Sequence, residues 1–417
     1  MFESLRNVDR RTVRNLIAFW IFGMCNNFAY VIMLSAAEDI IDKQQHVTHQ
    51  NDTDADACEE HLTERHCSMM STGYILLADI IPSLIIKATF PFFMQRIPYG
   101  LRHFLVVLIQ AGSYLLVAFS QDLAMSITGV AFASMCSGLG EITLLSLTSY
   151  FPKSTISAWS SGTGGAGVVG SFAYAALTDP KLGHLTPTNA LLVMLVVPVT
   201  FALAYWILLA MPDTVYSPGI SPLTWIVPVN HDKKTTDAID IGDGYGTSWA
   251  DDCSSDDLPA DSNEALDAPE SNSEKVSQRH LSIKEKLLHV IPLLKYMIPL
   301  ALVYFGEYII NQGIVQLVFF NCSQGFGISR KSQYRWYQVL YQVGVFISRS
   351  SVSLIELPMW ILILLPVLQI LNAVFFFFDA LYMFVPHISI LFALILIEGL
   401  FGGASYVNSF NRIHREV

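Results

Sequence analysis

The chain has 417 residues, of which 53% are hydrophobic and only 14% are charged. A soluble domain would carry about a quarter of charged residues on its wetted surface. The apolar residues gather in runs of roughly 20, the length that crosses a bilayer as a helix. We therefore expect a polytopic α-helical membrane protein. The net charge of −11 leaves no basic footprint for a nucleic acid, so we exclude that partner.

Four arginines precede the first apolar run, which covers residues 15–37. Because positive residues hold the flanking end of a span in the cytosol, we expect residues 1–14 to be cytosolic. A polar loop follows at residues 38–70. It contains a sequon at Asn51, whose glycosylation requires that loop to lie in the lumen.

Five more apolar stretches follow, so residues 15–211 predict a bundle of six spans. They lie near residues 71–94, 101–120, 123–151, 158–177 and 188–211. Residues 212–290 are acidic and rich in Ser, Pro and Gly, which predicts a disordered cytosolic linker.

The second half, residues 291–410, predicts four spans and ends in a tail at residues 411–417. The spans lie near residues 291–320, 334–348, 354–378 and 388–409. A second sequon, at Asn321, falls on the predicted luminal side. Arg330, Lys331 and Arg335 contradict the positive-inside rule on that same side. Six spans, a long linker and four further spans predict two helical bundles, the architecture of secondary transporters.

Seven strings occur in order along this sequence. They are CNNFAYVIMLSAA (Cys25–Ala37), LLADIIP (Leu76–Pro82), GLGEITLLSLTSYFP (Gly138–Pro152), WSSGTGGAG (Trp159–Gly167), VYFGEYIINQG (Val303–Gly313), QYRWYQVLYQVGVFISRSS (Gln333–Ser351) and EGLFGGASYVN (Glu398–Asn408). Together they resemble the battenin family of lysosomal membrane proteins, across nearly all of the membrane-embedded chain.

The resemblance implies a major-facilitator-like fold in the lysosomal, or in fungi vacuolar, membrane. It also implies clearance of glycerophosphodiesters, with effects on lysosomal pH and on basic amino-acid (arginine) transport. Family members carry a further hydrophobic stretch after the YVN string. With about ten spans in this chain, we expect that last span to be missing. Sorting to the lysosome is inherited from the resemblance, because the linker shows no clear acidic dileucine signal.

Two glutamates lie in the middle of predicted spans, Glu141 in the first half and Glu307 in the second. Alternating-access proteins place substrate and proton sites at this depth, and charges there are costly to keep. We interpret both as part of a substrate or proton pathway. The structural alternative is a carboxyl group that is hydrogen-bonded to a neighbouring helix.

Polar residues recur around Glu307 on one predicted helix, at Tyr304, Asn311 and Gln312. They form either a stripe that faces the pathway or interhelical glue. Tyr337 belongs to a similar set on the next span, where an interfacial aromatic belt is the alternative.

A phosphodiester needs a cation, and the candidates within the spans are Lys87 and Arg349. Arg349 lies near a predicted span end, where its side chain could instead extend to lipid headgroups.

The glycines of the fifth span invite a phosphate-loop interpretation. We reject it, because no strand precedes them and no Lys-Ser/Thr follows. Close helix packing is the prediction for these small residues and for two that precede Glu141. They are Gly138, Gly140, Gly162, Gly164, Gly165 and Gly167.

Cys58 and Cys67 share the predicted oxidising lumen, which favours a disulfide over free thiols. No spacing of Cys, His or acidic residues matches a metal or cofactor motif, and no hydrolase constellation is present. We expect no enzymatic activity, metal or cofactor.

The leading hypothesis is a lysosomal transporter or facilitator for small polar solutes, with protons and the lysosomal membrane as further partners. The alternative is a non-transporting lysosomal scaffold that recruits cytosolic trafficking proteins through its linker.

Overall fold

The computed structural model describes residues 10–44, 71–213 except 93 and 153, 215–217, 219, 225–227, 291–351 and 356–416. These residues form helices and turns and contain no strand. The chain divides into one compact unit of residues 1–227 and 295–417 and a second unit of residues 228–294. Most of the predicted linker and the residues Asn51, Cys58 and Cys67 lie outside the described part. The linker residues 212, 213, 215–217, 219 and 225–227 are described, and Val215 packs into the core, which corrects the start of the predicted linker.

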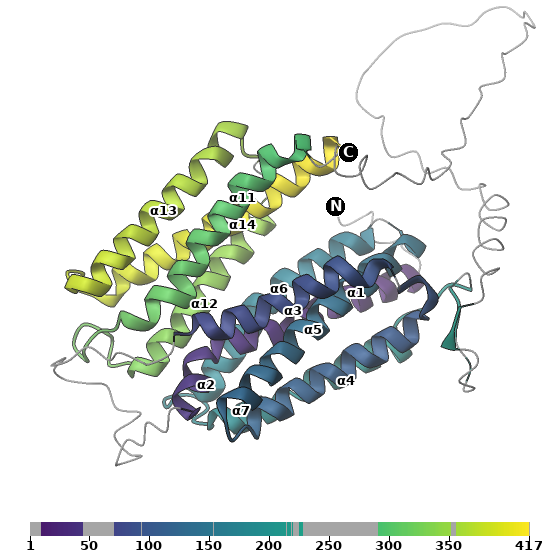
Figure 1. Cartoon of the computed structure of the whole chain (residues 1–417), viewed down its shortest axis with the longest axis horizontal. Coiled ribbons are helices and arrows are strands. Elements are labelled where there is room, and N and C mark those ends of the chain that lie inside the picture. Colours follow the sequence, from purple (N-terminus) through teal and green to yellow (C-terminus); the bar gives the residue numbers. More distant parts are fainter. Residues whose placement is uncertain are drawn as a thin grey trace, which may run out of the picture. The chain divides into compact units, whose positions relative to one another are not determined.

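The described residues of the first half form eight α-helices and several short helical segments (Figure 1). They are α1 (Arg10–Ser35), α2 (Ala37–Gln44), α3 (Gly73–Thr89), η2 (Phe90–Phe92), η3 (Met94–Arg96), α4 (Tyr99–Ala118), α5 (Leu123–Leu147), η4 (Thr148–Tyr150), α6 (Ser154–Thr178), α7 (Pro187–Val193), α8 (Val196–Leu203) and the π-helical η5 (Ala204–Leu208).

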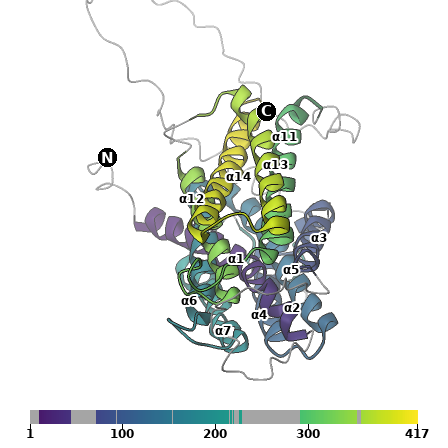
Figure 2. The ribbon, with the colours of Figure 1, turned by 90° about the vertical axis from the view of Figure 1, so that its left-hand side faces the viewer.

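In the described residues of the second half there are four longer helices, which lie side by side in Figures 1 and 2. The sequence of elements is η7 (Ile291–Leu293), α11 (Leu294–Ile309), η8 (Ile310–Ile314), η9 (Val315–Leu317), α12 (Arg330–Ser350), α13 (Met359–Tyr382) and α14 (Ile388–Glu416). The segment η8 is a π-helix, and it contains Asn311 and Gln312 of the polar stripe. Such π-bulges within α-helices are frequent at functional sites.

Helix α2 corrects one boundary of the sequence analysis, which placed residues 38–44 in a loop. Glu38 and Asp39 stand in its first turn, where the helix dipole favours negative charge. Ile40 and Ile41 are 4% and 2% exposed, so they join the core. Burial of this apolar face explains why a short polar segment is helical here.

Seven helical segments in the described part are long and apolar enough to cross a membrane. They are Arg10–Ser35, Tyr99–Ala118, Leu123–Tyr150, Pro187–Leu208, Ile291–Leu317, Met359–Tyr382 and Ile388–Phe410. Three helices that the sequence analysis counted as spans are not among them, because α3 has 17 residues, α6 is rich in Gly and Ser, and α12 carries a charged face. The chain is a multi-pass membrane protein, and ten spans stay a prediction.

Reciprocal glycines bring two pairs of helices into backbone contact. A Cβ at Gly162 of α6 would collide with the Trp20 carbonyl of α1, and a Cβ at Gly23 would collide with the Trp159 carbonyl. In the second half, a Cβ at Gly344 of α12 would collide with a backbone carbonyl of α14, and a Cβ at Gly399 of α14 would collide with one of α12. Small residues at both faces therefore allow α1–α6 and α12–α14 to pack closely.

Buried apolar side chains form separate clusters in the two halves. One cluster runs from Ala18 to Val215 and includes Phe22, Tyr114 and Phe201. Two others belong to residues 303–395. The halves meet chiefly where α6 packs against α12.

Candidate functional site

Glu307 lies in α11 with 1% of its surface exposed. Tyr341 of α12 donates a hydrogen bond to Glu307 Oε1, whereas Oε2 is buried without a partner among the described residues. Gly402 of α14 leaves the space for this carboxylate, since a Cβ there would collide with Oε2. Three helices thus enclose one carboxyl group.

A second glutamate, Glu398 of α14, is fully buried close to Glu307. Its Oε1 accepts a hydrogen bond of 2.9 Å from Asn311 Nδ2, and its Oε2 has no partner in the described part. The Asn311 carbonyl in turn accepts a bond of 3.4 Å from Gln338. The irregular π-helical turn η8 therefore presents Asn311 to α14 and α12 at once.

Arg349 lies near the end of α12, but its guanidinium points between helices. It donates to the Tyr304 hydroxyl at 3.3 Å and stacks over the Tyr406 ring at 4.3 Å from the centroid. Its Nε is buried without an acceptor in the part of the chain described. These contacts do not correspond to a side chain that extends to lipid headgroups.

Lys87 of α3 and Glu141 of α5 form an ion pair of 2.6 Å. Their side chains are 39% and 34% exposed, so this pair lies in a more open environment than Glu307. Tyr406 acts electrostatically on both Glu141 and Arg349. The two sequence-predicted cations and the two predicted glutamates therefore belong to one neighbourhood. We call Lys87, Glu141, Tyr304, Glu307, Tyr341, Arg349, Glu398 and Tyr406 the central cluster.

A dense set of ion pairs joins α2 to α12. Arg335 makes two bonds to the Asp39 carboxylate, at 2.6 and 3.0 Å, with both side chains nearly buried. Arg330 pairs with Glu38 at 3.0 Å, and Lys331 pairs with Asp42 at 3.3 Å. We call these three pairs the α2–α12 lock.

Helix α6 and its following turn complete the lock. Tyr174 donates to Asp39 at 2.9 Å, and Arg335 donates to the Thr178 carbonyl at 3.1 Å. Trp336 donates to Asp179 at 3.1 Å. Arg335 and Asp39 thus have nearly every polar atom engaged, which is the condition for a buried ion pair to hold its geometry.

Burial raises the pKa of Glu38 to about 8, against the lowering effect of Arg330. The neighbouring carboxylates of Asp42 and Asp39 raise this pKa further. The charge of Glu38 therefore changes in the physiological pH range.

Three predicted pathway residues lie outside the central cluster: Asn311, which donates to Glu398, and also Gln312 and Tyr337. The Gln312 side chain accepts from Tyr334 at 3.1 Å, and its carbonyl accepts from Thr72 at 2.6 Å, so it joins α3 to the second half. Tyr337 is fully buried, donates to the Val318 carbonyl at 3.3 Å and packs against Phe392. Its contacts are those of a core residue rather than of an interfacial belt.

The predicted packing glycines lie at helix contacts of several kinds. Gly138 faces Ser83 of α3, and Gly140 faces the Asn26 side chain of α1. Gly165 faces the Trp20 ring at 3.5 Å from an added Cβ. Gly164 and Gly167 face Phe346 and Gln342 of α12. Helix α6 thus uses different glycines toward α1 and toward α12.

The loop after η9 holds Asn321, whose Oδ1 accepts from Ser323 and from the Gln324 backbone at 2.9 Å. Cys322 beside it is disulfide-bonded, which the sequence analysis did not anticipate. Cys25 and Cys136 are free, so the partner of Cys322 lies outside the described residues.

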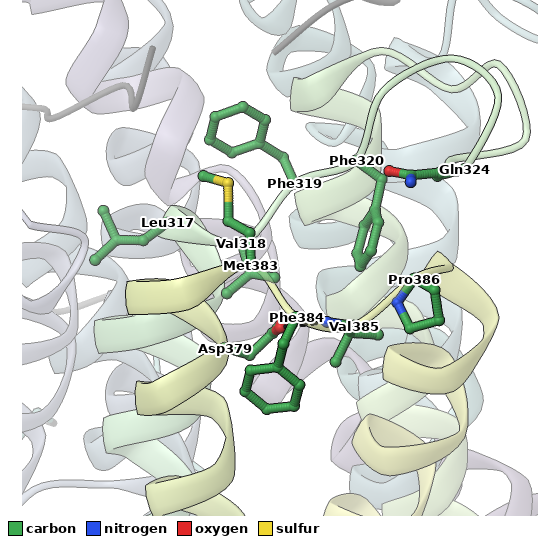
Figure 3. A pocket seen from close by; sticks show the side chains of 10 residues that line it. All are labelled: Leu317, Val318, Phe319, Phe320, Gln324, Asp379, Met383, Phe384, Val385 and Pro386. Carbon is green, nitrogen blue, oxygen red and sulfur yellow. Dashed lines mark hydrogen bonds between the residues drawn. The ribbon is translucent and has the colours of Figure 1, made fainter. Parts of the chain in front are cut away.

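A cavity of about 100 Å³ lies between η9 and the turn after α13 (Figure 3). Its lining is mostly apolar, with Asp379 as the charged member. Asp379 Oδ1 accepts from the Val385 backbone at 3.0 Å and so closes the turn in which Met383 is left-handed, with φ of 50°. This bond gives Asp379 a structural role.

Sequence reasoning missed Glu398, Asp39 and Arg335. The rule that an ionisable group within a span marks function would have selected Glu398, which stands in an apolar run. The signal for the lock was the breach of the positive-inside rule at Arg330, Lys331 and Arg335. The structure explains that exception, because each of these cations is paired with an acidic side chain of α2.

The sequence pattern of the CLN3 protein family matches residues 17–417. The dog protein named Battenin is 40% identical over 407 residues, which cover 97% of this chain and 83% of the dog protein. The Neurospora crassa protein btn-1 is 35% identical over 419 residues, covering 99% and 82% of the two chains. These relatives confirm the resemblance found in the sequence strings.

A solved structure shares the fold. The crystal structure of a bacterial homologue of the human lysosomal transporter Spinster superposes with a TM-score of 0.54 at 13% identity, covering 97% of this chain and 75% of that chain. At this identity the likeness concerns a transporter-like arrangement of helices alone. Together with the family match over nearly the whole sequence, these findings show that the chain belongs to the CLN3 protein family.

Proposed function

We propose that this chain is a lysosomal transporter or facilitator that carries small polar solutes, with glycerophosphodiesters as the best candidates. The lysosomal membrane is proposed because the relatives include Battenin. The effects on lysosomal pH and on arginine transport that the resemblance implies would be consequences of this activity. The chain would act without an enzymatic step.

The single observation that carries the proposal is the state of Arg349. Lys87 is paired with Glu141 at 2.6 Å. Arg349 has hydroxyl and aromatic contacts, and its buried Nε has no acceptor among the described residues. A guanidinium with free donors between two tyrosines matches the oxygens of a phosphodiester. We assign anion binding to Arg349 first and to Lys87 second.

Alternating access between two bundles of ten spans would expose this site to each side in turn. The separate apolar clusters of the two halves support two bundles. The ion pairs between the halves gather where α2, the end of α6 and the start of α12 meet. If residues 1–14 are cytosolic, that end is luminal, and we propose that the structure represents the state closed toward the lumen.

The test is uptake of radiolabelled glycerophosphocholine by liposomes that contain the purified protein. We expect saturable uptake that Arg349→Met reduces by at least about tenfold, because a charge-assisted anion contact is lost. Arg412→Met is the matched control. Arg412 lies near the end of α14 and donates to the Leu357 carbonyl.

Lys87→Met should reduce uptake less than Arg349→Met. No saturable flux of this solute or of arginine in the unsubstituted protein would reject the proposal and favour the scaffold alternative. Equal uptake by Arg349→Met and Arg412→Met would reject the role of Arg349.

A further inference from the structure

Asp79 is a buried carboxyl group that the proposed transport site does not use. It lies in the middle of α3 and is 1% exposed. Both of its carboxylate oxygens are buried without a hydrogen-bond partner in the described residues. Glu307 and Glu398 each have one donor, Asp379 has backbone donors and Glu141 has a lysine, so Asp79 has the fewest contacts of these carboxyls.

An ionised carboxylate in an apolar interior is very costly without a cation or several donors. A neutral carboxyl group tolerates the same surroundings far better. Asp79 has no such partner in the described part, and keeping an acidic residue there is unfavourable for the fold alone. Ionisable groups at membrane depth are therefore functional candidates, with proton relays as one of their uses.

Helices α1 and α5 and the segment η8 pack against α3. Tyr30 of α1, Cys136 of α5 and Tyr308 of α11 interact with Asp79 electrostatically, and none of them is a cation. On α3 itself, Lys87 is engaged by Glu141. Asp79 therefore faces hydroxyl and thiol groups, which can pass or accept a proton.

The Tyr30 and Tyr308 hydroxyl groups lie 3.2 Å apart and join the two halves of the chain. Tyr308 also interacts with Glu307 and, more weakly, with Arg349. Tyr30 interacts more strongly with Asp79 than with Glu307, and Tyr308 more strongly with Glu307 than with Asp79. In the described residues the two hydroxyl groups share a hydrogen bond, whereas Asp79 has none to either of them. This row of groups leads from α3 in the first half to the central cluster in the second.

We propose that Asp79 is a proton-binding site of the transporter and exchanges its proton with Glu307 through the Tyr30–Tyr308 hydroxyl pair. In each transfer the Asp79 carboxyl releases one proton, each hydroxyl accepts one and donates one, and the Glu307 carboxylate becomes protonated. The pair spans the two halves, so a movement that separates them interrupts the exchange. That interruption couples proton movement to alternating access. The inference rests on the proposed solute transport.

The experiment compares two modes of glycerophosphocholine movement in the same liposomes. Exchange of labelled for unlabelled solute needs no net proton movement, whereas accumulation against a gradient needs a coupled ion. A pH difference of about one unit can sustain at most about a tenfold concentration ratio for each coupled proton. We expect the unsubstituted protein to accumulate solute under such a pH difference.

Asp79→Asn should lose this pH-driven accumulation and retain exchange within about twofold of the unsubstituted rate. Asp379→Asn is the matched control, because the same substitution at another buried carboxyl leaves the oxygen that accepts from Val385. We expect it to retain both modes. Should Asp79→Asn fail to fold, Tyr30→Phe removes one hydroxyl of the row and should give the same loss.

Two results would overturn the inference and leave solute transport intact. One is that the unsubstituted protein exchanges the solute but does not accumulate it under a pH difference. The other is an undiminished pH response in a folded Asp79→Asn or, if that variant is unfolded, Tyr30→Phe. The absence of both exchange and accumulation in the unsubstituted protein would instead reject the proposed function itself.

Discussion

The α2–α12 lock and the central cluster differ in how far their charged side chains are paired. In the lock each carboxylate of α2 faces a cation of α12, and Arg335 and Asp39 have additional donors and acceptors from α6. Among the described residues, Glu307 and Glu398 of the central cluster each keep one unpartnered oxygen, and Arg349 keeps an unpartnered nitrogen. In the lock the Glu38–Arg330 pair also keeps an unpartnered oxygen and nitrogen, so the contrast is sharpest for the Arg335–Asp39 pair. Satisfied polar networks are rigid, whereas unsatisfied groups are available to a ligand or a proton. The difference separates a region that holds the halves together from one that can exchange contacts.

The largest expected effect is the loss of the buried pair in the lock. Arg335→Met leaves the Asp39 carboxylate buried without its cation, so the free energy of unfolding should fall by about 3–5 kcal/mol. Denaturant unfolding in detergent micelles measures it. Adding Asp39→Asn should restore part of the loss, because the uncompensated charge is then removed. A loss below about 1 kcal/mol for Arg335→Met would show that the lock does not stabilise the fold.

The second prediction concerns the pH dependence of the lock. The folded-state pKa of Glu38 is about 8, above its ordinary value of 4.5, so the folded protein binds more protons between these values. Stability should therefore decrease as pH rises from about 4.5 to about 8. Thermal unfolding across this range should show a smaller decrease for Glu38→Gln. An identical slope in both proteins would assign the pH dependence to another group.

A smaller effect is expected for the ion pair of the central cluster. Lys87 and Glu141 are each about a third exposed, so their interaction is screened more than that of Arg335 and Asp39. A double-mutant cycle with Lys87→Met and Glu141→Gln should give a coupling energy of about 0.2–1 kcal/mol. If the corresponding cycle for Arg335 and Asp39 gave an equally small or equally large coupling energy, the two regions would not differ in the strength of their ion pairs.

The smallest effect on stability is expected for Glu398→Gln. An amide keeps the oxygen that accepts from Asn311 and removes a carboxyl group that lacks a second partner. The free energy of unfolding should change by less than about 1 kcal/mol. The same type of substitution in the lock, Asp39→Asn, serves as the comparison and should cost several times more. Equal losses for the two variants would show that both carboxyl groups are structural.

Much of the fold follows from patterns within single segments. Apolar runs predict the long helices, and Glu141 and Glu307 stand out as charges inside them. The partners of those charges depend on contacts between distant segments, so the pairing of Lys87 with Glu141 could not be predicted. Helix α2 was missed because Ile40 and Ile41 become an apolar face only when other helices cover them. Arg349 was placed near a span end, and only its tertiary contacts with Tyr304 and Tyr406 show its inward direction.

The reciprocal glycines have a mechanical consequence. Where Gly23 meets α6 and Gly162 meets α1, two backbones touch without side chains between them, and Gly344 and Gly399 repeat this in the second half. Such close backbone contacts leave no space for the two helices to shift against each other, so each helix pair should move as one rigid body. The contact of α6 with α12 is made through side chains instead, since an added Cβ at Gly164 would meet the Phe346 ring at 3.5 Å and one at Gly167 would collide with the Gln342 side chain. A rotation of one half relative to the other would then occur at the contact of α6 with α12, and the ion pairs of the α2–α12 lock would restrain it.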